Sequence, residues 1–345
     1  MIPAGTPENT RRNNMRLTLS ALTALILSIM LLCGCGVTAK PQAVSTAAPD
    51  QAAETLTQEH ALSVISTLFP PFDFARQISG GLAQITLLLP PGSESHTYEP
   101  TPQDILRIQK CDVFLYIGGE SEAWVTKLLE SMDTSHMRVV RLIDCVKPVE
   151  EELGQGMEDH SEAQPESPSA VFDEHIWTAP QNAILMTKAI SQALIKADPD
   201  HADAYQSNTA AYIEQLSKLD QTFEQIAQSA VRHTLVFGDR FPFRYFVDAY
   251  GFEYYAAFPG CAEQTEPSAA TVAFLIDRVR EQNIPVIFYI EFSNERMADT
   301  ICEATGAKKL LLHSCHNVSK DDLEGGATYI SLMYQNAQNL REALS

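Results

Sequence analysis

The chain has 345 residues, which is enough for two compact lobes, and 45% of them are hydrophobic, the ordinary share for a globular protein. Its formal net charge is −20. A surface this acidic repels phosphate, which argues against a nucleic-acid partner, and it attracts cations.

The beginning of the chain has the pattern of an export signal. Three arginines precede an apolar stretch at 17–32, which is short for a membrane span. The stretch runs into the tetrapeptide Leu-Cys-Gly-Cys, which ends at Cys35 and resembles the lipobox of bacterial lipoproteins. We therefore expect residues 1–34 to be a lipoprotein signal peptide and Cys35 to be lipidated, with an uncleaved membrane anchor as the alternative. Residues 35–58 are rich in small and polar residues without apolar periodicity, which predicts a flexible tether.

Short strands alternate with helices in the next part of the chain. Strands are predicted at 62–68, 83–89, 113–117 and 138–142, and helices at 72–79, 102–110, 123–132 and 182–196. Such alternation is typical of a parallel sheet with helices on its faces, so we predict an N-terminal α/β lobe at 59–200. Residues 146–172, rich in Glu, Pro and Ser, interrupt this lobe and are expected to form a mobile acidic loop.

A long amphipathic run at 201–230 predicts a helix that connects two lobes. At 1.5 Å per residue it would be ~40 Å long, which exceeds what a single strand–helix unit needs. Residues 231–345 then repeat the alternation, with strands at 234–237, 254–258, 286–290 and 309–312 and helices at 243–250, 269–282, 294–305 and 329–344. The predicted fold is therefore α/β, with two Rossmann-like lobes of parallel sheet joined by one long helix. Open sheets of this kind bind ligands at the carboxyl ends of their strands, which places a site in the cleft between the lobes.

Four histidines lie close to the ends of predicted elements in both lobes. His96 follows the strand at 83–89, and His175 lies shortly before the helix at 182–196. His313 and His316 follow the last predicted strand. Each of them, taken singly, is typical of a capping or solvated loop residue. Together they predict a zinc site, because neutral imidazole is a preferred donor for zinc and other borderline transition metals.

The segments around these histidines resemble the substrate-binding lipoproteins of zinc and manganese ABC transporters. The resemblance covers nearly all of the chain after the signal. It is carried by Phe-Pro-Pro-Phe-Asp-Phe-Ala at 69–75, His-Thr-Tyr-Glu-Pro-Thr-Pro at 96–102, His-Ile-Trp at 175–177, Tyr-Phe at 245–246, Tyr-Gly at 250–251, Glu-Pro-Ser at 266–268 and the run 329–344. It implies two α/β lobes that are joined by a long helix and hold a divalent metal between them. It also implies delivery of the metal to a membrane permease and its ATPase by a protein anchored outside the cytoplasm.

The resemblance also implies four ligand positions. The first two map onto His96 and His175. The third falls on Arg240, which has no lone pair for a metal, so the adjacent Asp239 is the expected substitute. An ion pair with Arg240 or a helix cap is the alternative role for Asp239. The fourth position falls on His316, and an imidazole in place of the relatives' carboxylate favours Zn²⁺ over Mn²⁺.

Two further residues near the predicted site are candidates for it. His313 is the alternative to His316 as the fourth ligand, because the two lie about one helical turn apart in the sequence. Glu291 follows a buried predicted strand and is the candidate to orient an imidazole.

Five cysteines remain when those of the predicted signal peptide and lipid anchor are excluded. Because five is odd, at least one of them is not in a disulfide within the chain and is either a free thiol or bound to another group. They are Cys111, Cys145, Cys261, Cys302 and Cys315. Cys315 lies between His313 and His316 and would bind zinc as a thiolate. We expect instead a buried thiol, or a disulfide with Cys261 or Cys302.

The predicted function is capture of zinc for an ABC importer, without catalysis. A zinc-dependent metallohydrolase is one alternative, with Glu291 or Asp239 as the general base, but the sequence contains no His-Glu-x-x-His pattern. A surface adhesin is the other, and no adhesive repeat is present in the sequence.

Overall fold

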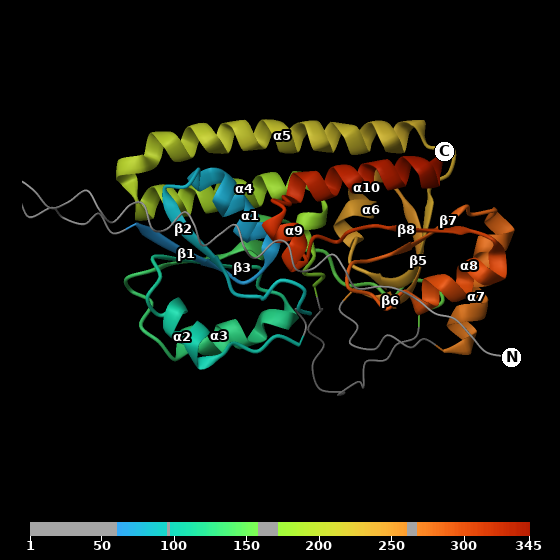
Figure 1. Ribbon diagram of the computed structural model, residues 1–345, viewed down its shortest axis with the longest axis horizontal. Helices are drawn as coiled ribbons and strands as arrows, with labels where there is room; N and C mark the ends of the chain where they lie inside the picture. Colours follow the sequence, from blue (N-terminus) through green and yellow to red (C-terminus); the bar gives the residue numbers. More distant parts are fainter. Residues whose placement is uncertain (1–60, 95–96, 158–171, 261–267) are drawn as a thin grey trace, which may run out of the picture. The chain divides into compact units, whose positions relative to one another are not determined.

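Two four-stranded sheets, each entirely parallel, organise the part of the chain that the structure describes (Figure 1). This computed structural model describes residues 61–94, 97–157, 172–260 and 268–345. The predicted signal peptide, the tether and Cys35 lie outside these residues.

The first sheet has the strand order β2-β1-β3-β4. Its strands are β1 (Leu62–Ser66), β2 (Ala83–Leu87), β3 (Val113–Tyr116) and β4 (Arg138–Arg141). The helices of this lobe are α1 (Phe69–Ser79), α2 (Pro102–Ile108), α3 (Ala123–Glu130) and α4 (Pro180–Ala197), with short 3₁₀ helices η1 (Glu120–Glu122), η2 (Leu142–Cys145), η3 (Ile176–Thr178) and η4 (Pro199–His201). Every side chain of β3 is buried, as expected for an apolar run in the middle of a sheet covered on both faces.

Helix α1 begins three residues before the position expected from the sequence. The prediction started the helix at Phe72, directly after two consecutive prolines. The structure starts it at Phe69, with Pro70 and Pro71 in its first turn. Proline is tolerated there because the first N–H groups of a helix have no partner within the helix.

The second sheet has the strand order β6-β5-β7-β8. Its strands are β5 (Thr234–Phe241), β6 (Glu253–Pro259), β7 (Val286–Tyr289) and β8 (Lys308–Leu311). The helices are α6 (Arg244–Tyr250), α7 (Ala269–Gln282), α8 (Arg296–Thr305), α9 (Lys320–Glu324) and α10 (Tyr329–Leu344). Strand β5 is longer than predicted, because it continues through Gly238-Asp239-Arg240 with a shift of register against β6 between Phe237 and Arg240. Such irregularities redirect the side chains at the end of a strand.

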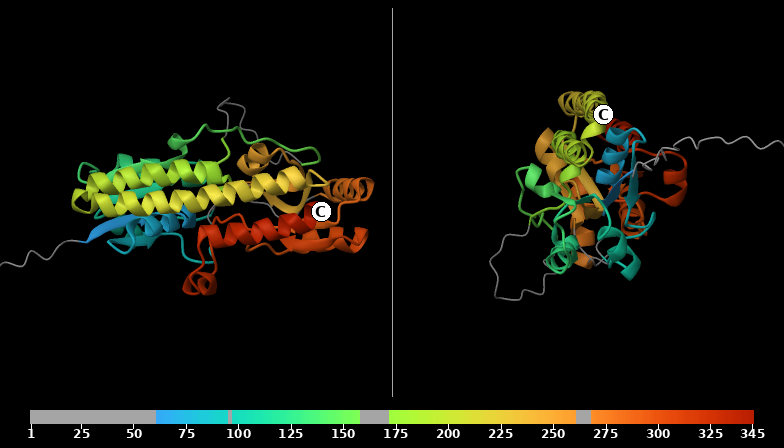
Figure 2. Two further views of the ribbon diagram at one scale, coloured as in Figure 1. Left: turned by 90° about the horizontal axis from the view of Figure 1, so that it is seen from above. Right: turned by 90° about the vertical axis from the view of Figure 1, so that its left-hand side faces the viewer.

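Helix α5 (Ala202–Ser229) is the predicted long connector. It packs against α1 and α4 of the first lobe and against α6 and α10 of the second (Figures 1 and 2). Its buried face has the helical spacing read from the sequence and consists of Tyr205, Thr209, Tyr212, Leu216, Leu219, Phe223 and Ile226. The prediction of two parallel-sheet lobes joined by one long helix is confirmed.

No helix in the described ranges is both long enough and apolar enough to cross a membrane.

Candidate metal centre

His175 is completely buried and is held by a carboxylate two residues before it. Its Nδ1 lies 3.1 Å from Oδ1 of Asp173, and the same oxygen accepts the backbone N–H of His175 at 2.8 Å. The carboxylate favours the tautomer that carries its proton on Nδ1, which leaves the lone pair of Nε2 available to a metal. Burial opposes a charge on this ring, but the carboxylates of Asp173, Glu174 and Glu151 outweigh burial and raise the pKa of His175.

His316 comes from the other lobe and meets His175. The ring centroids lie 5.3 Å apart, with the ring planes at 89°. Trp177 packs against both rings, with its centroid 5.5 Å from that of His175 and 5.0 Å from that of His316. The indole Nε1 donates to the carbonyl oxygen of Ser314 at 2.7 Å, which ties the His175 segment to the loop that carries His316.

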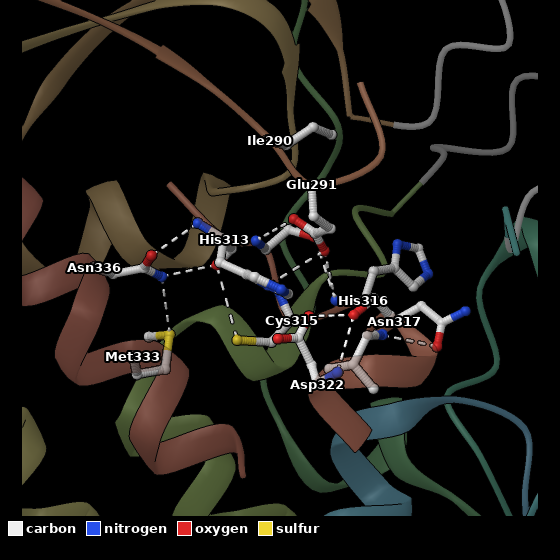
Figure 3. Close-up of polar contacts among 12 residues, drawn as sticks. Ile290, Glu291, His313, Cys315, His316, Asn317, Asp322, Met333 and Asn336 are labelled. Atoms are coloured by element: carbon white, nitrogen blue, oxygen red, sulfur yellow. Dashed lines mark hydrogen bonds and ion pairs between the residues drawn. The ribbon is translucent and has the colours of Figure 1, made fainter. Parts of the chain in front are cut away.

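Glu291 shapes that loop from the end of β7 (Figure 3). Its carboxylate accepts the backbone N–H of Ser314 at 2.7 Å and the hydroxyl of Ser314 at 2.6 Å. It also accepts the backbone N–H of His316 at 3.1 Å. Glu291 was expected to orient an imidazole. Its carboxylate contacts the backbone of His316, and its Oε1 lies 3.5 Å from Nδ1 of His313.

His313 has a structural environment that differs from that of His316. Its Nδ1 accepts the backbone N–H of Cys315 at 2.9 Å, and Asn336 of α10 bonds both its backbone N–H and its carbonyl oxygen at 2.7 Å. Between the two histidines, Cys315 adopts a left-handed backbone with φ of 62°. This turn sends the two imidazoles in different directions (Figure 3), so that only His316 of the pair lines the pocket with His175.

Cys315 is a buried free thiol, in agreement with the first of the two expectations. Burial raises the pKa of this thiol far above its ordinary value, which opposes the thiolate form that metals need. Cys302 is also free, so the pairing with Cys315 does not form, and Cys261 lies outside the described residues.

The two imidazoles border a cavity of about 20 Å³. Its wall includes the charged side chains of Glu94, Arg240 and Glu291. A cavity of this size has room for about one water-sized particle, which is also the size of a metal ion.

Arg240, on which the third implied ligand position falls, lies in the wall of the small pocket. Its guanidinium forms an ion pair with Glu94, at 3.0 Å between Nη2 and Oε2. Asp239, the expected substitute ligand, lines a neighbouring cavity of about 310 Å³ and does not line the small pocket. Its two oxygens accept the backbone N–H groups of Arg240 at 2.8 Å and Ile290 at 3.2 Å.

The segment that leads to His96 is fastened to the His316 loop, although His96 itself lies outside the described residues. The side-chain amide of Asn317 donates to the carbonyl oxygens of Pro90 at 2.8 Å and Ser93 at 2.9 Å. Gly92 donates its N–H to the carbonyl of Val318 at 2.8 Å. Over the ranges that the structure describes, no three His, Cys, Asp or Glu side chains are grouped closely enough to hold a metal.

Two residues of the site were missed from the sequence. Asp173 had a signal, since it lies two residues before a candidate ligand and a carboxylate commonly backs a metal-binding imidazole. Gly260 had none. A Cβ at this position would lie 3.0 Å from Cε1 of His175 and 3.0 Å from the carbonyl oxygen of Phe241, so a larger residue would crowd the ring.

The chain is similar in sequence to zinc-binding proteins of two bacteria. It is 32% identical over 286 residues to the high-affinity zinc uptake system protein ZnuA of Bacillus subtilis (strain 168). The aligned region covers 82% of this chain and 88% of that protein. It is 30% identical over 282 residues to the zinc-binding lipoprotein AdcA of Streptococcus pneumoniae (strain R6). The aligned region covers 81% of this chain and 55% of AdcA. The chain therefore spans about half the length of the pneumococcal relative.

The fold is similar to that of a solved domain. The Zn(II)-bound ZnuA-like domain of S. pneumoniae AdcA matches with a TM-score of 0.69 at 28% sequence identity, over 82% of this chain and 98% of that domain. The model of the ZnuA family, described as zinc-uptake complex component A periplasmic, matches residues 64–343. This match extends over most of the chain, which therefore belongs to the ZnuA family.

Proposed function

We propose that this chain captures zinc outside the cytoplasm and delivers it to the permease of an ABC importer, without catalysing a reaction. One observation carries the proposal: two buried imidazoles, His175 and His316, meet at one small pocket with their centroids 5.3 Å apart. Imidazole donors suit zinc better than manganese. Membership of the ZnuA family and similarity to the zinc-binding proteins ZnuA and AdcA support zinc as the cargo.

The proposed protein ligands are the three histidines expected from the sequence. His175 and His316 would bind through the ring nitrogens that face the pocket, and His96 would be the third. Asp239 is assigned a supporting role at the end of β5, because both of its oxygens accept backbone N–H groups.

The proposed partners are a permease and its ATPase, and the proposed attachment is a lipid at Cys35. The pattern of residues 1–34 and the similarity to the lipoprotein AdcA support this anchoring. Expression of Cys35→Ala in a bacterial host tests it, because loss of the lipid would move the protein from the membrane fraction to the soluble fraction.

Calorimetric titration with zinc tests the binding function. We expect one zinc per wild-type chain. His175→Ala and His316→Ala should each weaken binding by more than the roughly 100-fold caused by loss of an outer-shell partner. His136, an exposed histidine whose Nε2 lies 3.0 Å from the carbonyl oxygen of Gln109, provides the control variant His136→Ala. Unchanged zinc affinity in both pocket variants would exclude this site.

The two alternatives expected from the sequence have less support. The ZnuA family is one of zinc-uptake components and not of hydrolases, so we do not retain a zinc-dependent metallohydrolase. No arrangement within the described residues favours a surface adhesin.

A further inference from the structure

Arg240 places a permanent positive charge in the wall of the small pocket. The side chain is 10% exposed and lines the pocket together with His175 and His316. A guanidinium stays protonated at every usable pH, so it cannot bind a metal and it repels one. A divalent cation in this pocket must therefore be accommodated beside a fixed cation.

The guanidinium also has a buried donor without an acceptor. Its Nη2 donates to Glu94, but its Nε–H is buried and finds no acceptor among the residues that the structure describes. A buried donor without an acceptor costs free energy, which a ligand oxygen would recover. The orphaned donor therefore points to a ligand that accepts hydrogen bonds.

The charges of the small pocket define the kind of ligand. The two carboxylates in its wall, Glu94 and Glu291, together with Arg240, give it one net negative charge. A divalent cation would turn this into one net positive charge, which a single monoanion would neutralise. Asp239 does not enter this count, because it does not line the small pocket.

The neighbouring cavity provides room for the body of an organic anion. It measures about 310 Å³ and shares Glu94, Arg240 and Phe292 with the small pocket. Its wall also contains the apolar Met297 and the polar Asn294. Arg240 thus stands between a space for a cation and a space for a small molecule.

We propose that the site takes its divalent cation together with a small carboxylate anion, whose oxygens bind the cation and accept from Arg240. The inference rests on the proposed function and specifies its cargo as a metal–carboxylate complex. Arginine suits this role because its N–H groups match the geometry of a carboxylate.

Calorimetric titration of the full chain with zinc, at constant ionic strength, tests the proposal. The background salt is sodium perchlorate, and it is replaced in part by sodium acetate or by sodium chloride. Acetate should tighten the apparent zinc affinity of the wild type by about tenfold or more, the effect of one charge-assisted contact. An equal effect of chloride would overturn the carboxylate assignment.

Variants of Arg240 separate the guanidinium from general salt effects. In Arg240→Gln the acetate effect should disappear. In Arg240→His, which places an imidazole at the third ligand position, zinc affinity should not depend on acetate. The control Arg138→Gln, at an exposed arginine of β4, should keep the wild-type response.

A second measurement covers the case in which a variant does not fold. Native mass spectrometry of the wild type should detect one acetate for each bound zinc, and zinc without acetate would overturn the inference. Zinc affinity that is equal in all three salts would also overturn it and leave the proposed function standing. Absence of zinc binding in every salt would contradict the proposed function itself.

Discussion

The carboxylate of Asp173 decides which ring nitrogen of His175 is available to a metal. Since Oδ1 of Asp173 lies 3.1 Å from Nδ1, the proton belongs on Nδ1, and Nε2 is the nitrogen that can bind a metal. In Asp173→Asn the shape is kept, but the negative charge that backs the imidazole is lost. We expect zinc affinity to fall by about 10- to 100-fold in calorimetry. Asp144→Asn, at an exposed carboxylate, is the control, and equal affinities in the two variants would exclude the supporting role of Asp173.

Gly260 provides the space in which the ring of His175 lies. In Gly260→Ala the new methyl group would lie 3.0 Å from Cε1 of His175, so the ring or the strand end must shift. We expect weaker zinc binding with a smaller effect on thermal stability. The matched control is Gly325→Ala, directly after α9. Its new methyl group would lie 3.0 Å from the carbonyl oxygen of Asp321. Wild-type zinc affinity in Gly260→Ala would show that the ring tolerates displacement.

Glu122 makes the stability of the first lobe depend on pH. Burial raises the pKa of this carboxyl from 4.5 to about 7. Between these two values the folded chain holds a proton that the unfolded chain has released, so the free energy of unfolding falls as the pH rises through this window. The total loss is on the order of 3 kcal/mol.

Urea unfolding of Glu122→Gln between pH 4.5 and 7 measures this contribution. In the wild type the backbone N–H of Gly118 donates to Glu122 at 2.7 Å. Glutamine keeps an acceptor for this N–H, but its side chain does not titrate. The variant should therefore show a shallower fall in stability than the wild type. Glu214→Gln, at an exposed carboxylate of α5, should keep the wild-type slope. Parallel slopes for the wild type and Glu122→Gln would contradict this assignment.

Among the elements, α1 and α10 are joined by a buried carboxylate. Asp73 of α1 is completely buried and accepts the first N–H of α10, from Tyr329, at 2.9 Å. Asp73→Ala would leave that N–H without a partner at a buried helix start. We expect a loss of about 1–3 kcal/mol in the free energy of unfolding, measured with urea. Asp144→Ala should change it little, and an unchanged Asp73→Ala variant would show that α10 does not depend on this contact.

Element positions were predictable from the sequence where apolar periodicity was strong. Helices α7 and α10 have the predicted bounds, because their apolar spacing is regular and a capping serine or threonine marks the start of each. The end of β5 was not predictable, since Gly-Asp-Arg resembles a turn and only pairing with β6 extends the strand. Helix α9 was missed because five residues carry no period.

In the whole molecule, the site depends on contacts between the two lobes. Trp177 donates to the carbonyl of Ser314, and Tyr245 of α6 donates its hydroxyl to the carbonyl oxygen of Asp173 at 2.9 Å. His175 was predictable as a candidate because it lies shortly before a predicted helix, and His316 because it follows a predicted strand. Their approach across the lobes is a property of tertiary packing. The place of Arg240 in the pocket was equally beyond the sequence, because it depends on the register shift in β5.

Anomalous diffraction at the zinc edge, from crystals of the full chain grown with zinc, tests the central claim most directly. The account predicts one strong peak within bonding distance of Nε2 of His175 and of a ring nitrogen of His316, at about 2.0–2.1 Å. A peak elsewhere on the molecule, with none between these two rings, would contradict it.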